Sequence, residues 1–252
     1  MKATRIILAS LFCFSLCGFA QTADELVAKN ILARGGMDKM KAIQSLRVTG
    51  TFDASGFKAA IGSESKRPNL LRQTFAVQGM TQIQAYDGSS AWHISPFGGK
   101  KDPELLGDDD SRSLIEAADF DGPLVDAAAK GNTVEYLGHD QVDGDDAYKL
   151  KVTLKNGDIF YYYLDPDTYL EIQIEKQVFI RGSVRESLTL LGSYKPVNGV
   201  MYPFSIESGA KNDPDGRGKI NLTKIEANVS VDDKSFKMPS APAAAPAKAS
   251  AK

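Results

Sequence analysis

Apolar and polar residues alternate along most of the second half of the chain. Residues 132–231 form about seven extended segments, separated by turn sequences and without a helical pattern between them. One connection is Asn156-Gly157, which suits a type I′ hairpin because both residues tolerate positive φ, and another is Asp165-Pro166-Asp167. These connections are too short for a crossover helix, so we predict that neighbouring strands pair as an antiparallel meander.

The segment 170–180 alternates most regularly. Its apolar side carries Leu170, Ile172, Ile174, Val178 and Ile180, and its polar side carries Glu171, Gln173, Glu175 and Gln177. This period of two predicts a strand with one buried face and one solvated face. At roughly 3.3 Å per residue the strand would be about 35 Å long, which suits a curved, incomplete barrel better than a small sandwich. The dry concave face would be either a filled core or a cavity.

The first half of the chain begins with a helix and continues with strands. Thr22 and Glu25 form a capping box, and Gly35-Gly36 ends the helix that it opens. A first strand is expected where Leu46, Val48, Gly50 and Phe52 alternate with polar residues. Further strands are expected at 57–66, 69–78, 80–87 and 90–94.

Residues 103–130 interrupt the strands with helical sequence. Alanine and leucine replace β-branched residues in 111–120 and 124–130, and Asp121-Gly122-Pro123 separates the two segments. The apolar stripe of these short helices either packs permanently on the sheet or forms a movable lid over a cavity. The lid candidates are Leu114, Ile115, Phe120, Leu124 and Val125.

These patterns predict a mainly β protein of the α+β class. A single curved antiparallel sheet is expected to form an unclosed barrel, with the N-terminal helix and the short inserted helices covering its concave face. One domain spans residues 21–239 in this interpretation, because no repeat interrupts it. The Pro/Ala-rich residues 240–252 are expected to be a disordered tail, because they contain too little apolar surface to offset the entropy of ordering.

The first twenty residues predict export. Lys2 and Arg5 precede an apolar run, and small residues stand before Gln21, as in a signal peptide cleaved near Ala20. A retained anchor and lipidation at Cys17 are the alternatives. Cleavage would remove both cysteines and change the formal charge from −2 to −4, so disulfides, thiolate chemistry and nucleic-acid binding are not expected of the mature chain. The mature protein is expected in the periplasm, soluble and without a transmembrane segment.

Four motifs resemble those of a known family: Tyr86-Asp87-Gly88 with Trp92 and Pro96, residues 119–124, residues 161–165 and residues 194–204. In this order they resemble the outer-membrane lipoprotein-sorting family, the LolA/LolB-like proteins. The resemblance implies an unclosed barrel with helices over an apolar concavity that carries the acyl chains of lipoproteins. The arginine-containing N-terminal signature of the best-known carriers has no obvious match. Arg47 is the nearest candidate, but its alternation with Leu46 and Val48 predicts a solvent-facing side chain.

Acyl binding requires an apolar cavity more than exact polar contacts, because each buried methylene contributes roughly 0.8 kcal/mol. The candidates for a cavity lining are the apolar and aromatic residues assigned to the dry faces of the strands. They are Leu46, Val48, Phe52, Phe75, Tyr86, Trp92, Tyr161, Ile172, Ile174, Leu188, Leu190, Phe204 and Ile206. The same residues would fill the core if the barrel were packed.

Catalytic motifs are missing from the sequence. It contains two histidines, His93 and His139, and no His-Glu-x-x-His, Gly-x-Ser-x-Gly or phosphate-binding glycine loop. The acidic group 108–110 lacks the spacing of a calcium loop. We therefore expect no enzyme, metal or cofactor. The sequence leaves two interpretations: a periplasmic carrier of lipid or lipoprotein acyl chains, and a packed envelope module that binds other proteins without a ligand.

Overall fold

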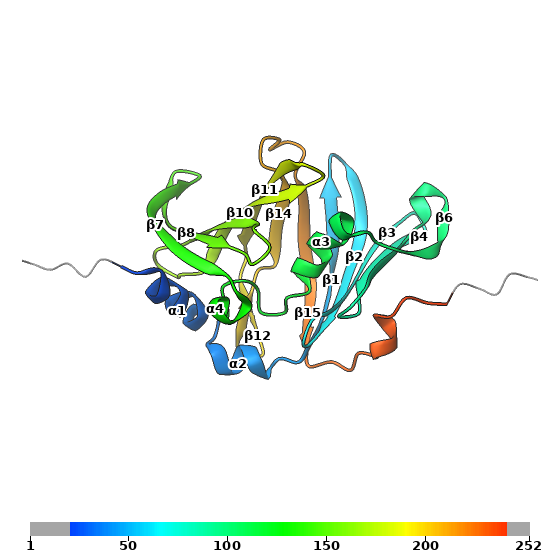
Figure 1. The fold of residues 1–252 in the computed structure, drawn as a ribbon, viewed down its shortest axis with the longest axis horizontal. Helices are drawn as coiled ribbons and strands as arrows, with labels where there is room; N and C mark the ends of the chain where they lie inside the picture. Colours follow the sequence, from blue (N-terminus) through cyan, green and yellow to red (C-terminus); the bar gives the residue numbers. More distant parts are fainter. Residues whose placement is uncertain (1–20, 241–252) are drawn as a thin grey trace, which may run out of the picture.

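The computed structural model describes residues 21–240. The predicted signal peptide at 1–20 and residues 241–252 of the predicted tail lie outside this range. Within it a single large sheet dominates (Figure 1). It has 13 strands in the order β6-β5-β4-β3-β2-β1-β15-β14-β11-β10-β9-β8-β7. Its strands are β1 (Ser45–Ala54), β2 (Phe57–Lys66), β3 (Leu70–Val77), β4 (Met80–Tyr86), β5 (Ala91–Ser95), β6 (Lys100–Leu105), β7 (Thr133–Val142), β8 (Asp145–Thr153), β9 (Ile159–Leu164), β10 (Glu171–Ile180), β11 (Ser183–Gly192), β14 (Ser205–Ala210) and β15 (Gly218–Ala227).

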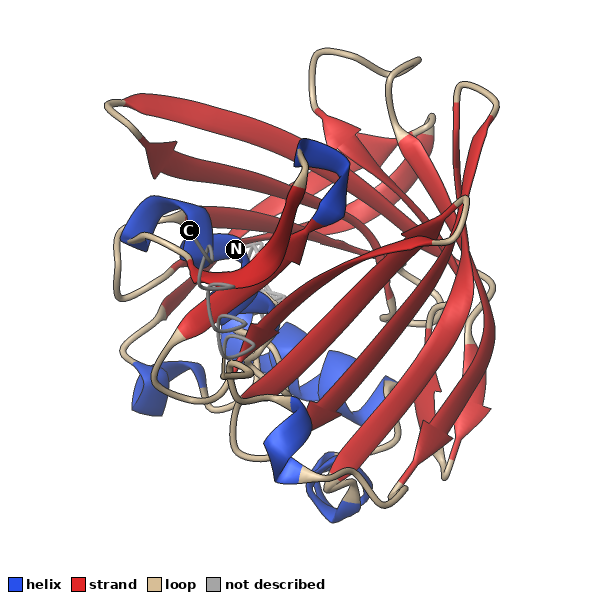
Figure 2. Ribbon diagram, turned by 90° about the vertical axis from the view of Figure 1, so that its right-hand side faces the viewer, coloured by secondary structure: helices blue, strands red, loops and turns tan. Residues whose placement is uncertain are grey.

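The sheet is curved and open. All neighbouring strands pair antiparallel, and the edge strands β6 and β7 do not pair with each other. Figure 2 shows the strands bending around one concave side, which is the predicted unclosed barrel. A small hairpin of β12 (Lys195–Val197) and β13 (Val200–Tyr202) forms a separate two-stranded sheet. Strand β6 was not predicted, because Pro103 and the acidic residues near it resemble a loop.

The hairpin turns follow the local chemistry, with one correction. Arg181-Gly182 and Asn198-Gly199 both have positive φ and connect strands directly, as a type I′ turn requires. The prediction of such a turn at Asn156-Gly157 was wrong, since only Gly157 has positive φ there. The Asn156 Oδ1 instead accepts the Asp158 N–H at 3.1 Å, which closes a wider loop between β8 and β9.

The N-terminal helices lie at one end of the concave side (Figure 1). The predicted capping box opens α1 (Ala23–Ala33), with the Glu25 N–H donating to Thr22 Oγ1 at 3.2 Å. Gly35 then connects α1 to α2 (Met37–Ala42) with φ +122°, and a Cβ at this position would lie 2.2 Å from the carbonyl oxygen of Gly199. Only glycine therefore lets this turn approach the β12–β13 hairpin.

The inserted segment contains less helix than predicted at its second half. Helix α3 (Asp108–Ala117) begins three residues before the predicted start, with three aspartates in its first turn, where they complement the helix dipole. The second helix, α4 (Ala127–Lys130), is a single turn. Leu124 and Val125 precede it in an irregular segment, because Asp126 adopts a left-handed conformation. Two further turns of 3₁₀ helix occur, η1 (Pro96–Gly98) and η2 (Asp233–Ser235).

Both faces of the sheet carry buried clusters. On the concave face, Leu26 of α1 packs on Leu150 and Phe160 of the sheet. A second cluster on this face surrounds Met40 of α2 and Ile43. On the convex face of β8–β10, Val142, Ala147 and Tyr163 form a smaller cluster. Because paired residues share a face, the register assigns each strand residue to one of these two sides.

The polar side of β10 is a second correction. Glu171, Gln173 and Glu175 were expected in solvent, yet each is only 7–8% exposed. Gln173 and Glu175 pair with Tyr163 and Tyr161, Gln173 donates to Glu175, and the Lys211 ammonium lies 2.8 Å from Glu175. The Lys211 stem helps to bury Glu175 while its ammonium stays near the surface.

Candidate ligand-binding concavity

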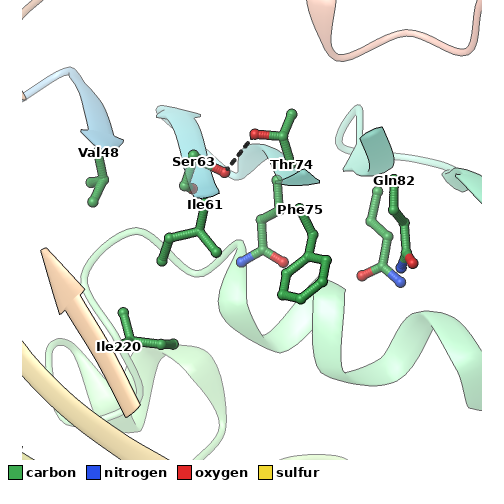
Figure 3. Close-up of a pocket in the computed structure, with 10 residues that line it drawn as sticks. Val48, Ile61, Ser63, Thr74, Phe75, Gln82 and Ile220 are labelled. Carbon is green, nitrogen blue, oxygen red and sulfur yellow. Dashed lines mark hydrogen bonds between the residues drawn. The ribbon is translucent and has the colours of Figure 1, made fainter. Parts of the chain in front are cut away.

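A cavity of about 420 Å³ opens on the concave face of β1–β4 and β15. Figure 3 shows Val48, Ile61, Phe75 and Ile220 contributing apolar walls from four strands. The remaining lining is uncharged and polar, and it consists of Gly62, Ser63, Gln73, Thr74, Gln82 and Gln84. The volume lies within the roughly 300–1,000 Å³ typical of small-molecule sites.

Four phenylalanines gather beside this cavity. The ring of Phe75 lies 5.4 Å from Phe52, 6.0 Å from Phe57 and 6.4 Å from Phe97, between ring centroids. Phe57 and Phe97 are 46% and 42% exposed, so the cluster reaches from the cavity to the surface at the hairpin tips. Gly218 makes room for it, since a Cβ there would lie 2.1 Å from the Phe52 ring.

The segment from α3 to α4 crosses the concave side and contacts three clusters. Leu114 packs with Leu71 and Tyr86, whereas Val125 packs with Met40 and Leu46. Leu124 belongs to the cluster around Leu150. Phe120 is partly buried and packs against the cluster that contains Val125. Ile115, the fifth lid candidate, is 43% exposed and lies outside these clusters. We call residues 108–126 the cover.

Ion pairs fasten the cover to the rest of the domain. The Arg67 guanidinium donates to both carboxylate oxygens of Asp121 at 2.6 and 2.8 Å, and the Lys41 ammonium donates at 2.6 Å. Burial alone would raise the pKa of the Asp121 carboxyl, but the hydrogen bonds from Arg67 and Lys41 lower it to about 2. A further pair joins Glu116 of α3 to Lys176 of β10 at 2.8 Å. The cover is thus attached to both halves of the sheet.

The sequence-predicted cavity residues divide between the two faces. Pairing register places seven on the concave side: Leu46, Val48, Phe52, Phe75, Tyr86, Ile174 and Ile206. Of these, Val48 and Phe75 line the 420 Å³ cavity. Phe204 precedes β14, with the Lys195 ammonium 4.7 Å above its ring.

Five candidates lie on the convex side, contrary to the assignment of all apolar positions to one face: Trp92, Tyr161, Ile172, Leu188 and Leu190. The Trp92 indole donates to the Phe236 carbonyl at 2.7 Å, beneath the C-terminal segment. Ile172 is displaced by a bulge between Glu171 and Gln173.

Sequence reasoning missed Ile61, Ile220 and the polar lining residues. Ile61 could have been found from alternation, because it lies two residues after the apolar Ala59. Ile220 could have been found in the same way, because it lies two residues before Leu222. Nothing in the pattern distinguishes Gln73, Gln82 and Gln84 from glutamines at the surface. Arg47 points to the convex side, as predicted, and its guanidinium lies 2.9 Å from Glu64.

The histidines lie in separate places. His93 in β5 is 3.6 Å from Glu104, and the exposed His139 in β7 is 2.6 Å from Asp146. In residues 21–240 no three His, Cys, Asp or Glu side chains are grouped to hold a metal ion. No helix in the same range is both long and apolar enough to cross a membrane.

Comparison with known proteins bears on the fold. No protein-family model and no curated protein matches the sequence. Among solved structures, a LolA superfamily protein from Nitrosomonas europaea has a TM-score of 0.59 at 14% identity, covering 86% of this chain and 98% of its own. The fold is LolA-like.

Two other structures have the same LolA-like architecture. A DUF1329 family protein from Desulfovibrio piger has a TM-score of 0.60 at 13% identity, over 85% of this chain and 97% of its own. A domain from Vibrio parahaemolyticus, named for outer membrane lipoprotein sorting, has a TM-score of 0.53 at 12% identity. The match covers 83% of this chain and 97% of that domain. At such identities the likeness concerns the fold and not the ligand.

Proposed function

We propose that this protein binds a hydrophobic ligand, lipid or lipoprotein acyl chains, on its concave face, and that it does so in the periplasm without catalysing a reaction. The observation that carries the proposal is the open cavity between Val48, Ile61, Phe75 and Ile220, in a LolA-like fold. Burial of an acyl chain there would be driven by roughly 0.8 kcal/mol per methylene.

The phenylalanine cluster supports this proposal. Phe57 and Phe97 expose apolar surface at one end of the cavity. Exposed apolar patches are typical of sites that bind a ligand or partner. An acyl chain entering between them would cover their rings. The glutamines of the lining add uncharged hydrogen-bonding groups, which do not repel an apolar ligand as a charge would.

The experiment is titration of delipidated protein with a fluorescent fatty acid. Two cavity-filling variants, Val48→Trp and Ser63→Trp, place an indole in the cavity and should lose uptake while unfolding at nearly the wild-type urea concentration. Thr51→Trp is the matched control, because Thr51 is exposed on the convex side of the same strand. Unchanged uptake in both filled variants would contradict the proposal and favour a packed envelope module that binds other proteins.

A further inference from the structure

A second pocket of about 300 Å³ lies between the cover and strands β9, β10, β11 and β13. Its apolar walls include Ile174, Leu191 and Met201, and three tyrosines, Tyr162, Tyr194 and Tyr202, add ring surface and hydroxyl groups. Arg34 at the end of α1 and Glu171 at the start of β10 bring opposite charges into the same pocket. No residue of the 420 Å³ cavity belongs to it.

The charged pair in this pocket is loosely made. The Arg34 guanidinium stands 3.6 Å from the Glu171 carboxylate, although the Glu171 side chain is only 9% exposed. The Tyr194 hydroxyl donates mainly to the Glu171 backbone oxygen at 2.7 Å and reaches the carboxylate at 3.4 Å. In contrast, the buried Asp121 nearby receives three hydrogen bonds of 2.6–2.8 Å. A buried carboxylate with such long contacts retains unused capacity to accept hydrogen bonds.

The tyrosines supply hydroxyl groups that keep their protons. Burial raises the pKa of the Tyr194 hydroxyl, and it raises that of Tyr202 to about 12. Both remain neutral at physiological pH and can donate or accept a hydrogen bond. The other charged side chains of the pocket are already paired: Lys176 with Glu116, Asp121 with Arg67, and Asp119 with Lys130. The pocket therefore presents one loose pair of opposite charges and neutral groups.

We propose that this pocket binds the neutral polar head of an acylated ligand, one that places a carbonyl oxygen against Arg34 and an N–H or O–H against Glu171. This inference rests on the proposed function. A carboxylate head would face the Glu171 carboxylate, and a cationic head would face Arg34, so a neutral group with both an acceptor and a donor suits the pair best. The amide of an N-acylated amine and the ester and hydroxyls of a monoacylglycerol share this chemistry.

Calorimetric titration with four amphiphiles of the same chain length tests this selectivity. The probes are N-methyldodecanamide, monododecanoylglycerol, dodecanoate and dodecyltrimethylammonium, each below its micelle concentration. At least one neutral probe should bind about tenfold more tightly than either charged probe, the effect of one poorly compensated charge. Preference for the amide identifies an N-acylated ligand, and preference for the glyceride identifies an acylglycerol.

Variants separate this pocket from general apolar binding. Glu171→Gln keeps the shape and removes the charge, so it should strengthen dodecanoate binding about tenfold and abolish the preference. Glu64→Gln is the matched control, because it breaks the Arg47 ion pair on the convex side and should leave the ranking unchanged. Should Glu171→Gln not fold, Tyr202→Phe is the second test: it should weaken binding of the neutral probes about threefold, through the loss of one hydrogen bond, whereas Glu64→Gln should not.

The results distinguish the two proposals. If all four probes bind equally, if the folded Glu171→Gln variant keeps the wild-type preference, or if Tyr202→Phe binds the neutral probes as tightly as the wild type, the head-group pocket is refuted while acyl binding stands. If no probe binds the wild-type protein, the proposed function itself fails.

Discussion

The ion pairs of Asp121 give a quantitative prediction for stability. The hydrogen bonds from Arg67 and Lys41 lower the pKa of this carboxyl from 3.8 to about 2. A depressed folded-state pKa contributes stability above the unfolded pKa, and this stability is lost as the pH falls through the folded pKa. The shift corresponds to about 2 kcal/mol at pH 7, falling to about 1 kcal/mol at pH 3.

Asp121→Asn removes this contribution without changing the shape of the side chain. Arg67 also donates to the carbonyls of Ile43 and Met40, so it retains partners in the variant and the loss should stay near the value above. We expect a loss of about 2 kcal/mol in the free energy of unfolding at pH 7, with the difference from wild type halved at pH 3. Urea unfolding across this pH range measures both.

Asp126→Asn is the control for this experiment. Asp126 also binds the Lys41 ammonium, at 2.8 Å, but its side chain is 47% exposed, and an exposed pair contributes only about 0–1 kcal/mol. The electrostatic account of the cover would be wrong if Asp121→Asn lowered the free energy of unfolding at pH 7 no more than Asp126→Asn does. It would also be wrong if the loss in Asp121→Asn stayed constant down to pH 3.

Two further substitutions test other parts of the fold, and one sequencing experiment tests the predicted export. Gly35→Ala should destabilise the protein by about 2 kcal/mol or more, measured by urea unfolding, because its Cβ would meet the Gly199 oxygen at 2.2 Å and φ is +122°. Trp92→Phe removes the hydrogen bond to Phe236 and should cost about 1–3 kcal/mol while leaving fatty-acid uptake unchanged, because Trp92 lies on the convex side. N-terminal sequencing of the protein exported by its host should begin at Gln21, and an intact first residue would overturn the predicted cleavage.

The pairing of strands joined by short turns was predictable because the turns are local, whereas the pairing of β1 with the distant β15 was not predicted. Connections such as Arg181-Gly182 determine which strands are neighbours, and their short length forces antiparallel pairing. The capping box of α1 is likewise contained within four residues.

The faces of the strands were less predictable because both sides of this sheet bury apolar residues. Leu188 and Leu190 pair with Glu175 and Gln173 on the convex side, where the sequence pattern suggested the concave side. A bulge in β10 also shifts Ile172, and a one-residue shift reverses the face of a side chain. Alternation shows that a strand has two faces, but it does not tell which face encloses a cavity.

The mixed lining of the cavity explains how a hollow sheet remains stable. A cavity of about 420 Å³ with only apolar walls would favour collapse, because its surface would gain by excluding water. Gln73, Gln82 and Gln84 contribute amides that hydrogen-bond to water, whereas Val48 and Phe75 contribute the surface that an acyl chain covers. The unloaded concave face can thus stay hydrated, and ligand entry releases water from the apolar walls. Replacing these glutamines with leucine should therefore stabilise the fold and reduce uptake together, since the side chains would then pack on one another.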